Sequence, residues 1–206
     1  MNRWLDRGIT LLLLALLGWA GWSMLHWLLV AADWSVVTTN LPLYAVGSFP
    51  ADQRWRPLLW MAALITLTLL TLTGPKRGWV RRWLPLVWIA MAPLGLWLLA
   101  GGLGLLPVGT RSWGGLTLTL LLTGGSGALA LPLGILLALG RRSELPVLRW
   151  SSAAYIELMR AVPLIAVLFF GQLLIPLFLP PGLEINRVLR AVVAFALFAA
   201  AYIAED

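Results

Sequence analysis

The sequence predicts an all-α, polytopic membrane protein with about six transmembrane helices and a cytoplasmic N-terminus. Of the 206 residues, 61% are hydrophobic, and the mean hydropathy is +0.90. Only 11% of the residues are charged, against about 25% in a typical soluble domain. Apolar runs of about 20 residues, the length that crosses a bilayer, recur along the chain. Most of the surface is therefore suited to lipid.

The first apolar run covers residues 9–32 and follows Arg3 and Arg7. It is too long for the core of a secretory signal and is not followed by a clear A-x-A cleavage site, so we predict an uncleaved first helix. The connector at residues 33–56 is rich in turn-forming residues, which predicts a solvated loop. Contact of this connector with a partner is the alternative.

The second predicted span covers residues 57–73 and the third covers residues 83–106. In the third span, Pro85 and Pro93 predict bends. The second span carries four threonines whose hydroxyls can hydrogen-bond to helix carbonyls and so cost little in lipid: Thr66, Thr68, Thr71 and Thr73.

Three further spans are predicted at residues 113–140, 162–179 and 188–204, with an arginine-bearing loop between the first two. The charges then set the orientation, because Lys and Arg concentrate on the cytoplasmic side. With the N-terminus inside, ten of the 15 basic residues are cytoplasmic and five are outside, and Glu205 and Asp206 lie inside. The ten are Arg3, Arg7, Lys76, Arg77, Arg81, Arg82, Arg141, Arg142, Arg149 and Arg160; the five are Arg54, Arg56, Arg111, Arg187 and Arg190.

Small residues recur every four positions in the fourth span, which places them on one narrow ridge of a helix. Such ridges allow membrane helices to approach closely, because packing must supply the association that lipid does not drive. The partner helix can lie in this chain or in a second copy. The ridge consists of Ser126, Ala130, Gly134 and Ala138.

The loop and the fifth span hold the notable polar residues. Glu157 and Arg160 are three residues apart and can pair on a helix face, with Tyr155 close by. Pro163 predicts a break at the membrane entrance, because it disfavours helix at the residue before it. By charge alone, an interfacial ion pair beside an ordinary cytoplasmic arginine explains this segment. Gln172 is polar at depth, which predicts a helix–helix hydrogen bond or a role in a translocation pathway.

Several classes of function find no support in the sequence. The net charge of +7 comes from arginines and lysines at the ends of apolar runs, so we expect no nucleic-acid partner. The chain has no cysteine and one histidine, so we expect no thiolate chemistry and no multi-histidine metal site. No acid lies within a predicted span, and no catalytic constellation is visible. A membrane-embedded enzyme is therefore the weakest alternative.

A family resemblance rests on four segments in order: GGLTLTLLL, PLGILLALGRRSELPVLRW, YIELMRAVPLI and AAYIAE. Together they resemble the integral membrane permease subunit of polar amino-acid ABC importers. The third segment is similar to that family's Y-x-E-x-x-R-x-x-P signature, which corresponds to Tyr155, Glu157, Arg160 and Pro163. The resemblance covers residues 113–206.

The resemblance implies a type I importer in the bacterial inner membrane. It implies a second permease subunit, an ABC ATPase subunit and a periplasmic amino-acid-binding protein as partners, besides membrane lipid. No G-x-x-x-x-G-K-[ST] loop occurs in the sequence, so we expect no cofactor on this chain and ATP on the partner. In this reading, Tyr155, Glu157, Arg160 and Pro163 are candidate coupling or structural residues.

The resemblance also predicts the domain organisation. Residues 1–112 are expected to be an N-terminal extension with three transmembrane helices, as in one subgroup of the family. Residues 113–206 are expected to be the first three helices of the transport core. The family places its ATPase-coupling loop after the AAYIAE position, so we expect a truncated chain that cannot drive transport alone. A non-transporting scaffold or regulatory subunit is the alternative.

Overall fold

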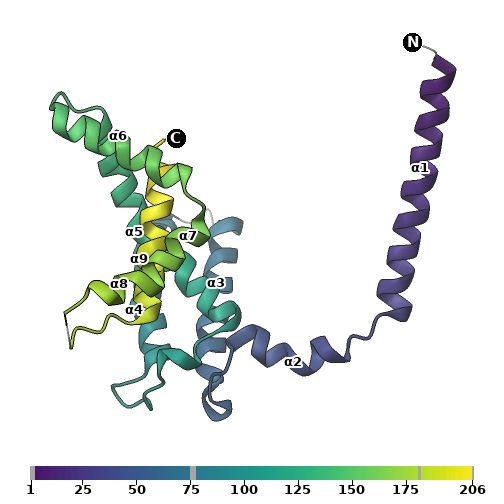
Figure 1. The fold of residues 1–206 in the computed structure, drawn as a ribbon. Coiled ribbons are helices and arrows are strands. Elements are labelled where there is room, and N and C mark those ends of the chain that lie inside the picture. Colours follow the sequence, from purple (N-terminus) through teal and green to yellow (C-terminus); the bar gives the residue numbers. More distant parts are fainter. Residues whose placement is uncertain (1–2, 75–77, 181, 206) are drawn as a thin grey trace. The chain divides into compact units, whose positions relative to one another are not determined.

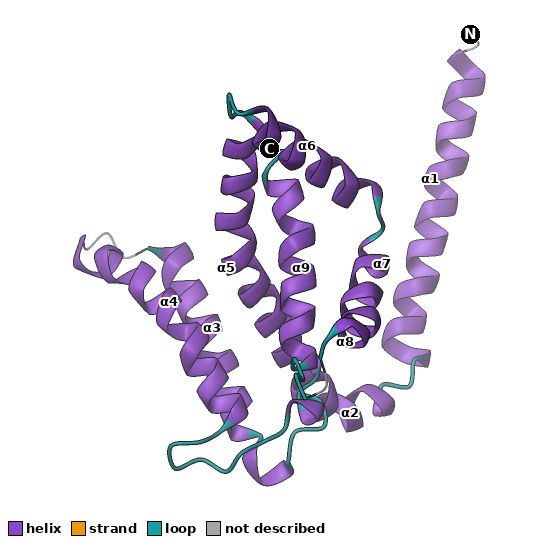
Figure 2. Ribbon diagram, turned by 60° about the vertical axis from the view of Figure 1, so that its left-hand side comes forward, coloured by secondary structure: helices purple, strands orange, loops and turns teal. Residues whose placement is uncertain are grey.

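The computed structural model describes residues 3–74, 78–180 and 182–205, except for the side chains of Arg3 and residues 79–81 (Figure 1). Three residues that were predicted to lie on the cytoplasmic side are outside the described residues: Lys76, Arg77 and Asp206. Within those ranges the chain is helical and contains no strand (Figure 2), as predicted. The helices are α1 (Arg3–His26), α2 (Ser35–Val46), α3 (Trp55–Thr73), α4 (Gly78–Ala100), α5 (Gly115–Arg141), α6 (Pro146–Ala161), α7 (Leu164–Phe169), α8 (Ile175–Phe178) and α9 (Arg187–Ile203).

Four of the described helices are long and apolar enough to cross a membrane, and a fifth span is counted if the bent pair α6 and α7–α8 is one broken span. The polytopic class is therefore confirmed, whereas the predicted number of six is not. Helix α9 has 17 residues, the short end of what crosses a bilayer, and is not among the four. The side of the N-terminus stays a prediction.

The chain divides into two compact units at residues 1–41 and 42–206. The first unit contains α1, which continues through a π-helical turn, η1 (Trp27–Ala31). The side chains described along α1 and η1 are nearly all exposed, as expected of a helix that faces lipid. The boundary predicted at residue 113 stays a prediction for the transport core, but residues on both sides of it pack together in the second unit.

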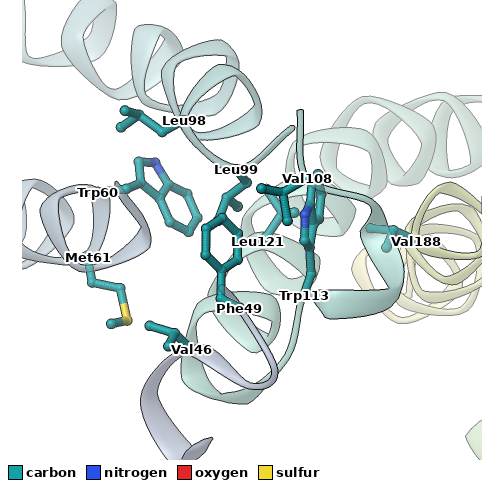
Figure 3. Packing of buried hydrophobic residues seen from close by; sticks show 10 residues of the cluster. All are labelled: Val46, Phe49, Trp60, Met61, Leu98, Leu99, Val108, Trp113, Leu121 and Val188. Carbon is teal, nitrogen blue, oxygen red and sulfur yellow. The ribbon is translucent and has the colours of Figure 1, made fainter. Parts of the chain in front are cut away.

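The prediction of a solvated loop at residues 33–56 is wrong for much of that segment. Residues 35–46 form α2, and a 3-10 turn, η2 (Ala51–Gln53), follows. Val46 and Phe49 are buried in a core that α3, α4, α5 and α9 complete. Figure 3 shows Phe49 between the side chains contributed by the other elements. The segment does contain turn-forming residues, but its apolar residues Val46 and Phe49 are buried against distant helices, which the local sequence does not reveal. The core consists of Val46, Phe49, Trp60, Met61, Leu98, Leu99, Val108, Trp113, Leu121 and Val188.

Helices α3 and α4 form an antiparallel hairpin. All four threonines of α3 donate to the carbonyl four residues earlier at 2.7–2.8 Å, as predicted. The Trp60 indole donates to the carbonyl oxygen of Met91 at 3.0 Å. It lies so close to Gly95 that a Cβ there would meet the ring at 2.4 Å. A small residue at 95 is therefore what allows α3 and α4 to pack.

The third predicted span is too long at its C-terminal end. Helix α4 ends at Ala100, and residues 101–109 form a loop instead of extending the helix to 106. Gly101 and Gly102 have φ of 82° and 93°, the left-handed region that ends helices. The apolar residues of this loop concealed the helix end from a hydropathy-based prediction. Pro85 and Pro93 both lie within the continuous α4.

Candidate functional site

Helices α5 and α9 form the axis on which the candidate site is built, and the small-residue ridge of α5 lies against α9. Ser126, Ala130 and Gly134 are buried, and Ala138 is half-buried. Ala130 packs in one cluster with Ala196 and Ala200. A Cβ on Gly134 would lie 2.6 Å from Cγ2 of Ile203 and 3.1 Å from the carbonyl oxygen of Ala200. The partner of the ridge is therefore a helix of the same chain.

Helix α6 lies across the end of the α5–α9 pair (Figure 2). The segment predicted as a loop between residues 141 and 160 is thus mostly helical, with a turn at residues 142–145. Ile156 is 1% exposed, and a Cβ on Gly140 would meet the Ser152 hydroxyl at 2.3 Å. The Tyr155 hydroxyl donates to the carbonyl oxygen of Leu197 at 2.9 Å. Tyr155 therefore fastens α6 to the middle of α9.

Two arginines converge on one carboxylate at this end of the molecule. Arg141 at the end of α5 forms an ion pair with Glu205, and Arg160 near the end of α6 lies 3.3 Å from the other carboxylate oxygen. We call Arg141, Arg160 and Glu205 the ion-pair cluster. The predicted pair of Glu157 with Arg160 is not formed among the described residues, because Glu205 takes Arg160 instead. Glu157 itself is exposed.

The electrostatics of the ion-pair cluster favour the charged form of its acid. The hydrogen bond from Arg141 holds the pKa of Glu205 below its ordinary value, and the charges of Arg141 and Arg160 act in the same direction. An open hollow of about 460 Å³ lies beside the cluster. Its lining includes Arg141, Arg142 and Glu205. Sequence spacing did not identify Glu205 as a site residue, since Arg141 is 64 positions away; its place at the end of AAYIAE was the available signal.

Pro163 lies at an abrupt change of direction. Helix α6 ends at Ala161, and Val162 and Pro163 are both extended, with ψ of 134° and 139°. Helix α7 then starts at Leu164, and the two helical segments are bent by 104°. The break falls where the proline predicted it, because a residue before proline avoids the α conformation.

Gln172 is fixed near the opposite end of α9, on a π-helical turn, η4 (Phe170–Leu174). Its Nε2 donates to the carbonyl oxygen of Arg187 at 2.9 Å. Asn186 caps α9 by accepting from the amide of Val188 at 2.8 Å. It also donates to Thr110 Oγ1 at 3.1 Å, and Arg187 Nη2 donates to the carbonyl oxygen of Thr110 at 2.7 Å.

We call Thr110, Asn186 and Arg187 the Thr110 clamp. Thr110 begins the 3-10 turn η3 (Thr110–Ser112), in the predicted N-terminal extension, whereas Asn186 and Arg187 begin α9. The clamp therefore joins the two predicted domains and, through the Arg187 carbonyl, reaches Gln172.

Arg56 is a buried cation that the charge count had placed among solvated outer residues. It is 1% exposed. Its Nη1 donates to the carbonyl oxygen of Leu106 at 2.9 Å and to Gln53, and its guanidinium lies 5.8 Å from the centroid of the Phe49 ring. It joins η2 to the loop after α4. Burial of an arginine depends on such long-range partners, which are not visible in the local sequence.

No group of three or more His, Cys, Asp or Glu side chains is placed to hold a metal ion within the residues that the structure describes. The geometry at the Arg141 end is instead that of a contact between the ends of helices. Three helices meet there through a carboxylate, two arginines and close contacts between small residues.

Comparison with known proteins identifies relatives of this chain. The sequence is 40% identical to the inner membrane amino-acid ABC transporter permease protein YhdY of Escherichia coli K12 over 191 residues, covering 91% of this chain and 51% of the relative. It is 33% identical to the glutamate/glutamine/aspartate/asparagine transport system permease protein BztC of Rhodobacter capsulatus, covering 84% of this chain and 53% of the relative.

A shorter similarity, 34% identity over 96 residues, links 44% of the chain to the glutamate/aspartate import permease protein GltK of Escherichia coli O6:H1. No protein-family model matches the sequence, and no solved structure matches it significantly. The chain spans about half the length of the two longer-aligned relatives.

The alignments extend the resemblance that the sequence motifs carried. Those motifs lie in residues 113–206, whereas coverage of 91% of the chain also takes in much of the preceding 112 residues. Most of residues 1–112 therefore also align with a relative. Over most of its length the chain is thus similar to amino-acid ABC transporter permeases, and its long apolar helices are those of a multi-pass membrane protein.

Proposed function

We propose that this chain is part of the permease subunit of an ATP-driven amino-acid importer and forms part of the translocation pathway across the inner membrane. The observation that carries the proposal is the 40% identity to an amino-acid ABC transporter permease over 91% of the chain. The names of the relatives favour this function over a non-transporting scaffold or a membrane enzyme. ATP hydrolysis belongs to a partner ATPase, and a second permease subunit and an amino-acid-binding protein complete the assembly.

The relatives also indicate which substrates to test first. BztC is named for glutamate, glutamine, aspartate and asparagine, and GltK for glutamate and aspartate. We therefore propose acidic amino acids and their amides as the substrate class. Gln172 is the candidate polar residue of the pathway, held in place by its hydrogen bond to the Arg187 carbonyl.

The ion-pair cluster supports a mechanical role for the Arg141 end. Alternating access requires helices to rock around a substrate site as a body. Glu205 ties the ends of α5 and α6 to the end of α9, so a displacement applied to one of these helices is passed to the others. In the predicted topology this end is cytoplasmic, where an ATPase would act. Tyr155, Arg160 and Pro163 then serve as coupling residues that keep α6 in position.

Uptake by cells tests the proposal. The coding gene is deleted in the source bacterium, and uptake of labelled glutamate, glutamine, aspartate and asparagine is measured, with leucine as the unrelated control. We expect loss of uptake of at least one of the four and recovery with the restored gene. Unchanged uptake of all four would contradict the proposed substrate class.

The same deletion strain tests the proposed coupling role of Arg160. Arg160→Glu should fail to restore uptake, whereas Arg160→Lys should restore most of it because the charge is kept. Arg149→Glu is the matched control, since Arg149 lies on the same helix and forms no ion pair among the described residues. Equal uptake with Arg160→Glu and wild type, at equal expression, would remove Arg160 from the coupling role.

A further inference from the structure

Helix α6 has one face buried in the protein. Ser152 and Ile156 are buried, and the Tyr155 hydroxyl is bonded to α9. These residues are spaced three or four apart and so lie on one side of the helix. An ordinary surface helix would present only polar residues on its other sides.

The opposite side of α6 carries a second apolar stripe that no part of the described chain covers. Val147, Trp150 and Leu158 are 79%, 72% and 60% exposed, and the exposed Ala154 and Ala161 complete the spacing of three or four residues. We call these five residues the outer stripe. Beyond the break it leads to Ile165 and Phe169 on α7, which are also exposed.

Charged residues occupy a third side of α6, between the buried face and the outer stripe. By helical spacing, Arg149 and Arg160 fall on this side, whereas Glu157, seven residues after Trp150, borders the outer stripe; all three are exposed. The helix therefore has three faces of different chemistry, suited to protein, to an apolar phase and to water.

The position of α6 suits a helix that contacts protein, an apolar phase and water at the same time. It crosses the end of the α5–α9 pair, and the 104° bend prevents it from continuing along α7 into the bilayer (Figure 2). Arg141 and Arg142 lie at the end of the 27-residue helix α5, just before α6. Because basic residues at the end of a span lie near the headgroups, α6 is expected at that depth. Residues 141–161 contain four arginines and two glutamates, an excess of positive charge that suits anionic headgroups. Tryptophan, here Trp150, favours the boundary between headgroups and acyl chains.

We propose that α6 is an interfacial helix that rests on anionic phospholipid, with the outer stripe inserted among the acyl chains and the charged side facing water. Ile165 and Phe169 on α7, just beyond the break, are also exposed and apolar, so lipid around the spanning segment lies close in sequence to the stripe. A helix with a charged face and an apolar face lies in the plane of the interface in this way. The lipid surface would thereby support α6 from one side while α5 and α9 hold it from the other.

The absence of cysteine from the sequence makes a direct test practical. Val147→Cys, Trp150→Cys and Leu158→Cys each place a single spin label on the outer stripe, and Arg149→Cys is the control on the charged side. The full-length protein, purified with its native partners, is reconstituted into vesicles of phosphatidylethanolamine and phosphatidylglycerol. Power-saturation measurements then compare collisions of each label with oxygen, which enters lipid, and with a water-soluble nickel chelate.

We expect the oxygen-to-nickel collision ratio to exceed one at the three stripe positions and to fall below one at Arg149→Cys. Replacing phosphatidylglycerol by phosphatidylcholine should lower the ratio at the stripe. Ratios below one at the stripe would show it in water, and shielding from both reagents would show a protein partner; either result overturns the proposal. Stripe ratios that do not respond to removal of the anionic lipid would overturn its charge preference.

Discussion

Gly134 lies in close contact with α9 on the small-residue ridge. Any larger side chain there must displace Ile203 or the backbone of Ala200. We expect Gly134→Ala to lower the free energy of unfolding by about 1–3 kcal/mol, the usual effect of overpacking a tight contact. Unfolding of the detergent-solubilised protein measures the change.

Gly124 provides the matched control for this prediction. It lies on the same helix, and nothing is within 4 Å of a Cβ placed on it. Gly124→Ala should leave the stability unchanged or raise it by up to about 1 kcal/mol, because alanine favours helix. If the two substitutions had the same effect, the ridge would not be the contact that joins α5 and α9.

Glu205 makes the stability of the ion-pair cluster depend on pH. Its pKa is lowered in the folded protein, first by the hydrogen bond from Arg141. Its stabilising effect is therefore fully present above the ordinary pKa of 4.5 and is lost as the pH falls through the lower folded value. Glu205→Gln should unfold at a lower temperature than wild type at neutral pH, and the difference should shrink in acid. Glu144→Gln, at an exposed acid on the turn before α6, should show little such difference; a pH-independent effect of Glu205→Gln would contradict the ion-pair account.

Local patterns in the sequence predicted some of these residues and not others. Four-residue spacing was enough to place Ser126, Ala130 and Gly134 on one face, because helical geometry is local. The partner of Arg160 could not be found in this way. Glu157 satisfied the spacing rule, but the chain brings Glu205 to Arg160 from the end of another helix.

At the scale of elements, the Thr110 clamp is the connection between the extension and α9. Asn186→Ala removes both the helix cap and the bond to Thr110, so we expect a loss of about 1–2 kcal/mol in unfolding free energy. Thr110→Val removes only the hydroxyl acceptor and should cost about 0.5–1.5 kcal/mol. Chemical denaturation of both variants checks the order, and a larger effect of Thr110→Val would contradict it.

The elements themselves show why hydropathy predicts spans better than connections. Long apolar runs placed α3 and α5 to within two residues and placed α1 with η1 to within six, and Pro163 marked the break before α7. Helix α2 was missed because its polar residues and Pro42 resemble a loop, whereas Val46 and Phe49 gain burial only from distant helices. The C-terminal end of α4 was missed because Leu103, Leu105 and Leu106 continue the apolar run beyond the glycines that end the helix.

For the whole molecule, the charge distribution predicts that the Arg141 end of α5 is cytoplasmic. Leu145→Cys lies just beyond that end, and Leu103→Cys lies in the loop before α5, at a position that is 94% exposed. In intact cells, a membrane-impermeant maleimide should label Leu103→Cys and reach Leu145→Cys only after the membrane is opened. The reverse pattern would invert the topology and remove the ATPase from the Arg141 end.

The central claim is that this chain forms part of an ATP-driven amino-acid permease. The most direct measurement tags the native protein that carries this sequence, isolates its complex and reconstitutes that complex in vesicles with ATP inside on the ATPase side. The cognate binding protein then presents labelled glutamate, glutamine, aspartate or asparagine from the other side. We predict uptake that requires hydrolysable ATP and the binding protein. Uptake that is equal with a non-hydrolysable analogue, or absent although the ATPase is bound, would contradict the claim.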